Sequence, residues 1–244
     1  MTEHVQHSFK RYEIKFVLNP AQFETLYPML REKMQEDEYG VYPICNIYFD
    51  TPEYRLIRHS LDKPVYKEKF RLRSYGTISK DDMMFAEIKK KYKGVVYKRR
   101  VTLRGGDYEK LFKEGDAAID NRQIQEEIIQ FFHTYHNLAP KVFIGYDRIA
   151  LAGTGDDHTL RVTFDRNISY RETGLSLCKD DAVSPVLPKE AIVMEIKVTH
   201  ALPLWLVSIL SENRIYKTSF SKYGSYYNNY IAKQLIERMK CYAD

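Results

Sequence analysis

Charged and apolar residues alternate with a period of two along several segments, and this pattern constrains the fold more than any other feature of the sequence. Between Lys63 and Arg104 the spacing occurs three times, in Arg71 with Arg73, in Glu87 with Lys89, and in Lys98 with Arg100. Residues two positions apart on a β-strand share one face of the sheet. The spacing therefore predicts neighbouring strands with one charged face and one face of Phe, Val, Ile and Tyr.

The positive charge of the protein is concentrated in this same stretch. It contains fourteen Lys or Arg against four Asp or Glu, a net charge of +10, whereas the whole chain carries +5. The rest of the chain is therefore net negative. A charge so local, on strands that share a face, predicts a binding site for a polyanion.

The alternation continues in other segments, at Glu13 with Lys15, at Arg161 with Thr163 and Asp165, and at Glu195 with Lys197, and Arg148 lies in a further strand-like segment. For any single pair, a solvated face of an antiparallel sheet is the simpler interpretation. The bulky apolar residues opposite these charges, and the helices that must pack on them, favour charges inside and helices outside. We therefore expect an α+β fold: an eight-stranded antiparallel β-barrel with helices packed outside and a C-terminal helix at one end.

The order of the expected elements follows from turn and cap signals. The strands are expected at 9–18, 41–49, 65–75, 83–92, 95–104, 142–151, 160–168 and 192–198. Asn19-Pro20 and Asp50-Thr51-Pro52 are typical helix starts, and further helices are expected at 122–135, 203–213 and 221–240. Repeats and low-complexity linkers are absent, so residues 1–244 are expected to form a single domain.

Composition limits the class of protein. Three widely spaced cysteines, Cys45, Cys178 and Cys241, favour reduced thiols rather than a disulfide framework. The first residues have no apolar signal segment. The longest apolar run, Ala201 to Leu210, is about half of the ~20 residues that a membrane helix needs. We expect a soluble cytoplasmic protein.

A cationic interior with a few carboxylates suits phosphates. Arg offers a planar fork to phosphate oxygens, and Lys adds a mobile point charge. A divalent cation that bridges phosphate oxygens needs a carboxylate anchor. Glu195 is the first choice for that anchor and Glu13 is the second.

The segments that carry these residues also resemble a known family. They read RYEIKF (11–16), YFDTPEY (48–54), KFRLRSYG (69–76), FAEIKKK (85–91), YKRR (97–100), YDR (146–148), RVTFD (161–165), MEIKV (194–198) and FSKYGS (220–225). In this order they are similar to the VTC domain, the catalytic domain of the vacuolar transporter chaperone complex within the triphosphate tunnel metalloenzyme superfamily. The resemblance implies an eight-stranded tunnel and a polyphosphate polymerase that moves the γ-phosphate of ATP onto a growing chain with Mn²⁺ or Mg²⁺.

The resemblance also implies roles for individual residues. The expected catalytic set is Lys15, Arg71, Arg73, Lys89 and Arg148. The expected phosphate-binding residues are Lys98, Arg100, Arg161, Lys197, Ser221 and Lys222, of which Arg100 and Lys197 come from the alternation rather than from the family pattern. Glu195 matches the family's metal-binding glutamate.

Other functions stay open at this point. Many tunnel triphosphatases begin with Glu-x-Glu-x-Lys, whereas this chain has Arg11 in place of the first acid, which favours the polymerase. A metal-dependent inorganic or nucleoside triphosphatase, or a non-catalytic polyphosphate-binding module, are the alternatives. Expected partners are ATP or another triphosphate and inorganic phosphate or polyphosphate; an enclosed cationic face would exclude nucleic acid. The membrane helices of the eukaryotic complexes are missing, which leaves a separate membrane partner open.

Overall fold

A computed structural model of the protein describes residues 12–107, 110 and 120–241. Ten strands of this part form one antiparallel sheet. The bounds are β1 (Tyr12–Leu18), β2 (Met34–Glu36), β3 (Tyr42–Asp50), β4 (Tyr66–Tyr75), β5 (Met83–Tyr92), β6 (Val95–Arg104), β7 (Ala139–Gly153), β8 (Arg161–Arg171), β9 (Ser184–Pro185) and β10 (Ile192–Val198). The eight long strands are the predicted ones, although residues 9–11 of the first lie outside the described part.

The sheet is strongly curled but its ladder is not closed. Its order is β1-β10-β8-β7-β3-β4-β5-β6, with β2 paired to β7 and β9 paired to β8. Among the described residues no backbone pairing joins β1 to β6, so the expected closed eight-stranded barrel is not confirmed. A side-chain contact spans this seam, since Lys89 Nζ on β5 lies 2.6 Å from Glu13 Oε2 on β1.

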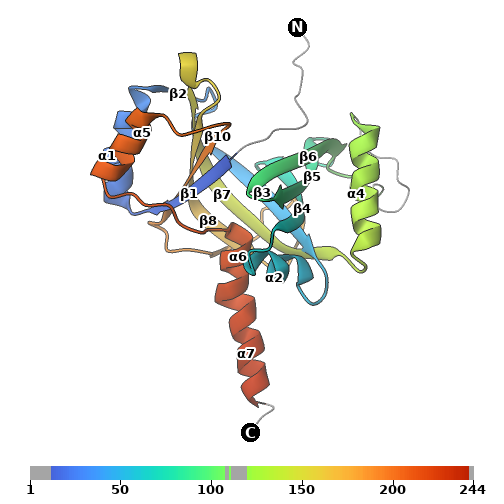
Figure 1. The fold of residues 1–244 in the computed structure, drawn as a ribbon. Helices are drawn as coiled ribbons and strands as arrows, with labels where there is room; N and C mark the ends of the chain where they lie inside the picture. Colours follow the sequence, from blue (N-terminus) through green and yellow to red (C-terminus); the bar gives the residue numbers. More distant parts are fainter. Residues whose placement is uncertain (1–11, 108–109, 111–119, 242–244) are drawn as a thin grey trace.

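The outer face of the sheet is apolar and covered by helices on two sides (Figure 1). Helices α1 (Pro20–Arg31) and α5 (Leu204–Glu212) pack on β1, β10 and β8, where Leu26, Leu206 and Phe164 belong to one buried apolar cluster. Helix α4 (Arg122–Thr134) packs on the β4–β6 side, where Phe131 meets Phe70. Because side chains alternate along each strand, this packing turns the charged positions to the inner face.

Asparagine side chains cap the start of two of these helices, and the first of them, Asn19, was predicted. Asn19 accepts a hydrogen bond from the Gln22 N–H, and the Gln22 side chain accepts one from the Asn19 N–H, which completes a capping box. Asn121 likewise accepts from the N–H of Ile124 at the start of α4. Both caps satisfy donors that the first helical turn leaves unpaired.

The C-terminal helical run closes one end of the curled sheet. It comprises α6 (Lys222–Tyr226), a π-helical segment (Tyr227–Ile231) and α7 (Ala232–Cys241), which extends away from the sheet (Figure 1). Tyr223 and Tyr226 are fully buried, and the ring of Tyr223 stacks on Tyr48 of β3 at 5.0 Å. The tyrosines therefore anchor the start of the helix and leave α7 projecting.

Asp50 acts as a helix cap, one of the two roles that its position at the end of β3 permits. Its carboxylate accepts from the N–H groups of Thr51, Leu56 and Ile57, and from the hydroxyl of Tyr223. It thereby joins the start of α2 (Arg55–Leu61) to the C-terminal run.

Within the described residues, no helix has the length and apolar character to cross a bilayer.

Candidate functional site

The predicted site residues meet on the inner face, where most of them form ion pairs around four carboxylates. Among the described residues, eight cationic side chains lie within 4 Å of one of those four, and a ninth, Lys69, lies on the same face and contacts Ser221. The cations are Lys15, Lys69, Arg71, Arg73, Lys89, Lys98, Arg148, Lys197 and Lys222, and the carboxylates are Glu13, Glu87, Asp165 and Glu195. The interior therefore carries an excess of positive charge that the protein itself does not neutralise.

Glu87 on β5 is the centre of the first group. Its side chain is 1% exposed, and its carboxylate lies 2.7 Å from Arg71, 2.5 Å from Lys98 and 3.8 Å from Arg73. Burial would raise the pKa of Glu87, but the three cations outweigh it and hold that pKa well below its usual range. Glu87 thus remains an anion that holds three cations in register.

Two tyrosines hold the arginine forks of this group. The Tyr48 hydroxyl accepts from Arg71 at 3.2 Å, and the Tyr146 hydroxyl accepts from Arg73 at 3.1 Å. The side-chain amide oxygen Oδ1 of Asn46 accepts a second bond from Arg73. Each guanidinium is therefore oriented before any ligand arrives, which lowers the entropy cost of binding.

Glu195 and Glu13 form the second group, across β10 and β1. Glu195 contacts Lys197 at 2.9 Å and Lys15 at 3.5 Å, while Glu13 contacts Lys89. Burial opposes ionisation of both carboxyls, yet the lysines keep the pKa of each below its ordinary value. Both acids chosen from the sequence are therefore ionised and adjacent on the inner face.

A divalent cation fits this group in part. Among the described residues no cluster of three or more His, Cys, Asp or Glu surrounds a common point. Mg²⁺ and Mn²⁺, however, need only one or two carboxylates when phosphates and waters complete the shell. Thr163 lies opposite Glu195 in the ladder, and its buried hydroxyl has no hydrogen-bond partner in that same part of the chain. The donors present suit a cation that arrives with a phosphate ligand.

Asp165 on β8 is the centre of the third group. It accepts two bonds from Arg148, at 2.7 and 2.9 Å, and one from Lys222 at 2.5 Å. Burial would raise the pKa of Asp165, but Lys222 and Arg148 lower it below its ordinary value. For Tyr146, burial likewise opposes the change, and Arg73, Arg148 and Lys222 lower its pKa to about 8.

Ser221 and Lys222 lie together at the start of the C-terminal run, as predicted. Ser221 is the N-cap of α6, where its hydroxyl oxygen accepts from the Gly224 N–H. Lys69 of β4 donates to the same oxygen at 3.1 Å. This contact brings the loop before α6 onto the cationic face.

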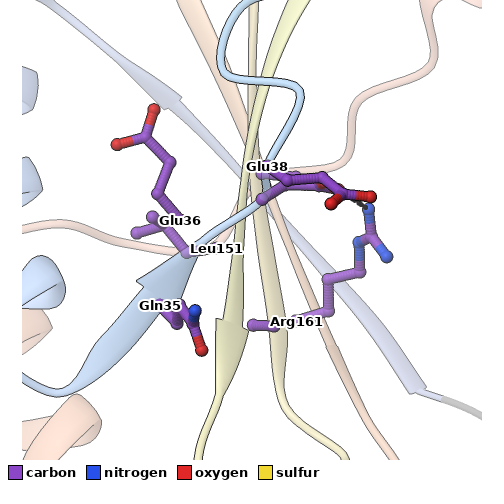
Figure 2. Close-up of a pocket in the computed structure, with 8 residues that line it drawn as sticks. Gln35, Glu36, Glu38, Leu151 and Arg161 are labelled. Carbon is purple, nitrogen blue, oxygen red and sulfur yellow. Dashed lines mark hydrogen bonds and ion pairs between the residues drawn. The ribbon is translucent and has the colours of Figure 1, made fainter.

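Two predicted phosphate ligands lie apart from the ion-pair groups. The Arg161 guanidinium lies 3.1 Å from Asp37 in the loop after β2, beside a pocket of about 270 Å³ (Figure 2). The Arg100 guanidinium lies over the ring of Phe85, 4.4 Å from its centre. Binding to a common phosphate chain would require both side chains to leave these contacts.

A second pocket, of about 450 Å³, lies at the seam of the sheet. Glu13 of β1, Lys91 of β5 and the loop residue His200 are among its lining residues. It opens beside the second ion-pair group. Glu13 belongs both to the lining of this pocket and to the second ion-pair group.

Residues outside the predicted set complete the site. Glu87 shares the face of Lys89 in the alternation, Lys69 shares the face of Arg71, and Asp165 shares the face of Arg161. The period-two rule therefore places all three on the inner face. Tyr146 lies two positions before Arg148 on β7, so the same rule places it on the inner face as well.

Lys90 and Arg99 lie on the opposite face, as the alternation predicts. Both contact Glu127 of α4, at 3.8 and 3.4 Å. Lys93 lies in the turn of the β5–β6 hairpin with a positive φ of 45°. These cations belong to the outer surface and not to the site.

Comparison with solved structures shows which fold this is. A candidate adenylate cyclase from Bacillus halodurans is 12% identical, with a TM-score of 0.56, 88% of this chain covered and 96% of that one. A candidate adenylyl cyclase from Hippeastrum, described as having a dominant triphosphatase activity, is 14% identical, with a TM-score of 0.51 and coverage of 91% and 96%. At these identities the likeness shows the fold alone.

The class of fold that the chain shares with these two structures is a curled antiparallel sheet with helices on its outer face. A search of curated proteins finds no match. The family model of the VTC domain matches residues 10–230. The chain therefore belongs to the VTC domain family.

Proposed function

We propose that the protein is a phosphotransferase of the polyphosphate polymerase type, which moves the γ-phosphate of ATP onto a phosphate or polyphosphate chain. The observation that carries this proposal is the excess of cations over carboxylates on one inner face. A linear polyanion supplies the missing negative charge at successive positions. The VTC family match supports the same conclusion.

The cations of the first group, around Glu87, would bind the transferred phosphate. Arg71 and Arg73 are forks held by tyrosine hydroxyls, and Lys98 adds a third cation beside Glu87. Arg forks fit the oxygens of a phosphoryl group, and fixed cations stabilise the charge that develops on them. Arg148 and Lys222 offer a second such position at Asp165.

Glu195, with Glu13, would hold a divalent cation of the Mn²⁺ or Mg²⁺ type. Such an ion neutralises charge on the transferred phosphoryl oxygens. Lys15, Lys197 and Lys89 hold these carboxylates ionised. In the reaction, a terminal oxygen of the acceptor attacks the γ-phosphorus, the bond to the β,γ-bridging oxygen breaks, and ADP leaves.

Hydrolysis is the second candidate, because water can take the place of the acceptor oxygen in the same site. The described triphosphatase activity of the Hippeastrum protein, which has a similar fold, favours this reading. The two reactions share every cationic contact and differ only in the nucleophile. Their products distinguish them.

The test is to incubate the purified protein with ATP and Mn²⁺ and to separate the products by gel electrophoresis. A ladder of long polyphosphate supports the polymerase, and orthophosphate alone supports the hydrolase. Tight polyphosphate binding without turnover refutes both enzymatic functions. Glu195→Gln is expected to abolish turnover while retaining most polyanion binding, whereas Glu127→Gln on the outer face should leave both unchanged. Full activity of Glu195→Gln would refute the metal assignment.

A further inference from the structure

Lys69 is a cation of the inner face that the predicted site did not include. It lies on β4, two positions before Arg71, and opposite Lys89 in the ladder with β5. Its side chain is partly buried, and its Nζ donates to the Ser221 Oγ at 3.1 Å. It therefore points inward, at the junction between the sheet and the C-terminal run.

The partners of Lys69 differ from those of its neighbours. Within residues 12–107 and 120–241, the other eight cations of the three groups each lie within 4 Å of a carboxylate, whereas Lys69 forms no ion pair. Lys15 on β1, Lys67 on β4 and Lys89 on β5 act on it by repulsion. An ammonium group in this position lacks a counter-ion.

Asp50 is the carboxylate whose charge reaches Lys69, but its oxygens are already engaged. They accept from three backbone N–H groups at the start of α2 and from the hydroxyl of Tyr223. An ionised carboxylate has about four lone-pair positions. Asp50 therefore cannot also serve as the counter-ion of Lys69 without losing a cap contact.

Ser221 adds a second donor beside Lys69. Its oxygen accepts from the Gly224 N–H and from Lys69, both at 3.1 Å. A hydroxyl that accepts can still donate its own hydrogen. An ammonium and a hydroxyl side by side, with no neighbouring carboxylate in ion-pair contact, are suited to a phosphate oxygen.

We propose that Lys69 and Ser221 form an additional phosphate subsite on the inner face, where the ammonium and the hydroxyl lie side by side. The inference rests on the proposed function, because it concerns the same polyanion. Lys69 is then both a ligand of the phosphate chain and the group that couples binding to pH.

The coupling follows from the surroundings of Lys69. Burial, and then Lys15, Lys67 and Lys89, lower its pKa to about 7. A phosphate oxygen next to the ammonium favours the charged form and raises the pKa. In the free protein about half of the Lys69 side chains are neutral at pH 7, and about nine tenths are neutral at pH 8. In the complex these side chains are charged.

The sign of the pH dependence is fixed by this uptake. A complex that holds more protons than its components weakens as pH rises. Polyphosphate affinity is therefore expected to fall by up to about tenfold per pH unit between pH 7 and 9 through Lys69 alone. Other groups add to the same trend, such as Lys98, whose pKa burial lowers to about 8. The contribution of Lys69 is therefore the difference between the unaltered protein and Lys69→Arg.

Calorimetry of the full chain with tripolyphosphate, in buffers of different ionisation enthalpy, measures the protons taken up. Lys69→Arg keeps a cation that cannot deprotonate in this range. Relative to the unaltered protein, it is expected to take up about half a proton less at pH 7 and almost one less at pH 8. Lys69→Met is expected to bind tripolyphosphate about tenfold more weakly, because a hydrogen bond to a charged group is lost.

Lys90→Arg is the matched control. Lys90 lies on β5, which pairs with the β4 strand of Lys69, but its side chain contacts Glu127 on the outer face. It should take up as many protons as the unaltered protein. A measurement without any substitution is the ¹³Cε titration of the lysines, in which one signal should titrate near pH 7 and move above pH 9 with tripolyphosphate. A free protein in which no lysine titrates below pH 9 would overturn the inference.

The outcomes separate this inference from the proposed function. Equal proton uptake by Lys69→Arg and the unaltered protein, with normal tripolyphosphate binding, would overturn the role of Lys69 alone. An unaltered protein that does not bind tripolyphosphate would overturn both. Reduced proton uptake in Lys69→Arg, relative to the unaltered protein, is the result expected.

Discussion

Glu87→Gln is expected to make the protein less stable and, at the same time, better at binding polyanions. Glu87 is 1% exposed and contacts Arg71, Lys98 and Arg73. The substitution keeps the shape of the side chain and removes the only negative charge in contact with these three cations among the described residues. Breaking a buried ion pair from one side costs about 3–5 kcal/mol, because the remaining charges are left uncompensated.

The magnitude is taken at the lower end of that range. The side chains of Lys98 and Arg71 are 37% and 17% exposed, so water screens part of the repulsion. We expect a loss of about 3 kcal/mol in the free energy of unfolding. For a chain of 244 residues this corresponds to a fall in Tm of about 6–12 °C.

Tripolyphosphate should reverse this loss. In the unaltered protein a phosphate must compete with Glu87 for the cations, whereas in Glu87→Gln it meets them unpaired. A ligand at a hundredfold its Kd adds about 2.7 kcal/mol to stability, and a tighter ligand adds more. The gain in Tm on adding tripolyphosphate should therefore be larger for Glu87→Gln than for the unaltered protein.

Thermal unfolding at pH 7.5, with and without tripolyphosphate, is the assay. Glu127→Gln is the matched control, because Glu127 also contacts two cations but is 25% exposed on the outer face. Its loss should cost about 0–1 kcal/mol and should not respond to tripolyphosphate. Equal destabilisation by the two substitutions, or no additional gain for Glu87→Gln, would refute the counter-ion role of Glu87.

Three further predictions concern neighbouring groups. The pKa of Lys69 in the folded protein is lowered to about 7, below its value in the unfolded chain, so the unfolded chain binds more protons above pH 7. The free energy of unfolding in urea should therefore rise from pH 7 to 9. Lys69→Met should flatten that rise, and an unchanged slope would contradict the prediction. Tyr146, with a pKa of about 8, should give a phenolate absorbance step near pH 8 that Tyr146→Phe removes; a step that persists must come from another tyrosine. Asp50→Ala should cost about 2 kcal/mol or more in urea unfolding, since it leaves buried N–H donors of α2 unsatisfied, and an effect below 0.5 kcal/mol, on the order of an exposed change, would argue against the cap.

The sequence was sufficient to predict the long strands because several of them, such as β4, β5 and β6, alternate charged and apolar residues. Arg71 and Arg73 could not both face inward unless Phe70 and Leu72 faced the helices, and the structure confirms that arrangement. The short strands β2 and β9 were not predicted, since three and two residues are too few for a period to be visible. Closure of the barrel was not predictable either, because alternation assigns faces and says nothing about which edges meet.

The partners of the site residues were the other limit. Alternation placed Arg161 on the inner face, but it could not show that Asp37, 124 positions away, would hold its guanidinium. It likewise placed Glu87 beside Lys89 without indicating that its carboxylate is shared by cations from β4 and β6. Such contacts depend on the curl of the sheet and on long side chains, and neither leaves a mark in local spacing.

Because β1 and β6 are not paired in the part of the chain that the structure describes, the sheet resists widening less at this seam than elsewhere. Elsewhere around the sheet, widening the interior would tear a ladder of backbone hydrogen bonds. At the seam, the contact between Glu13 and Lys89 is made by side chains, so no ladder of backbone hydrogen bonds between described strands has to break there. The sheet is therefore easiest to deform along this seam, where the interior can widen without breaking the pairing between any two described strands.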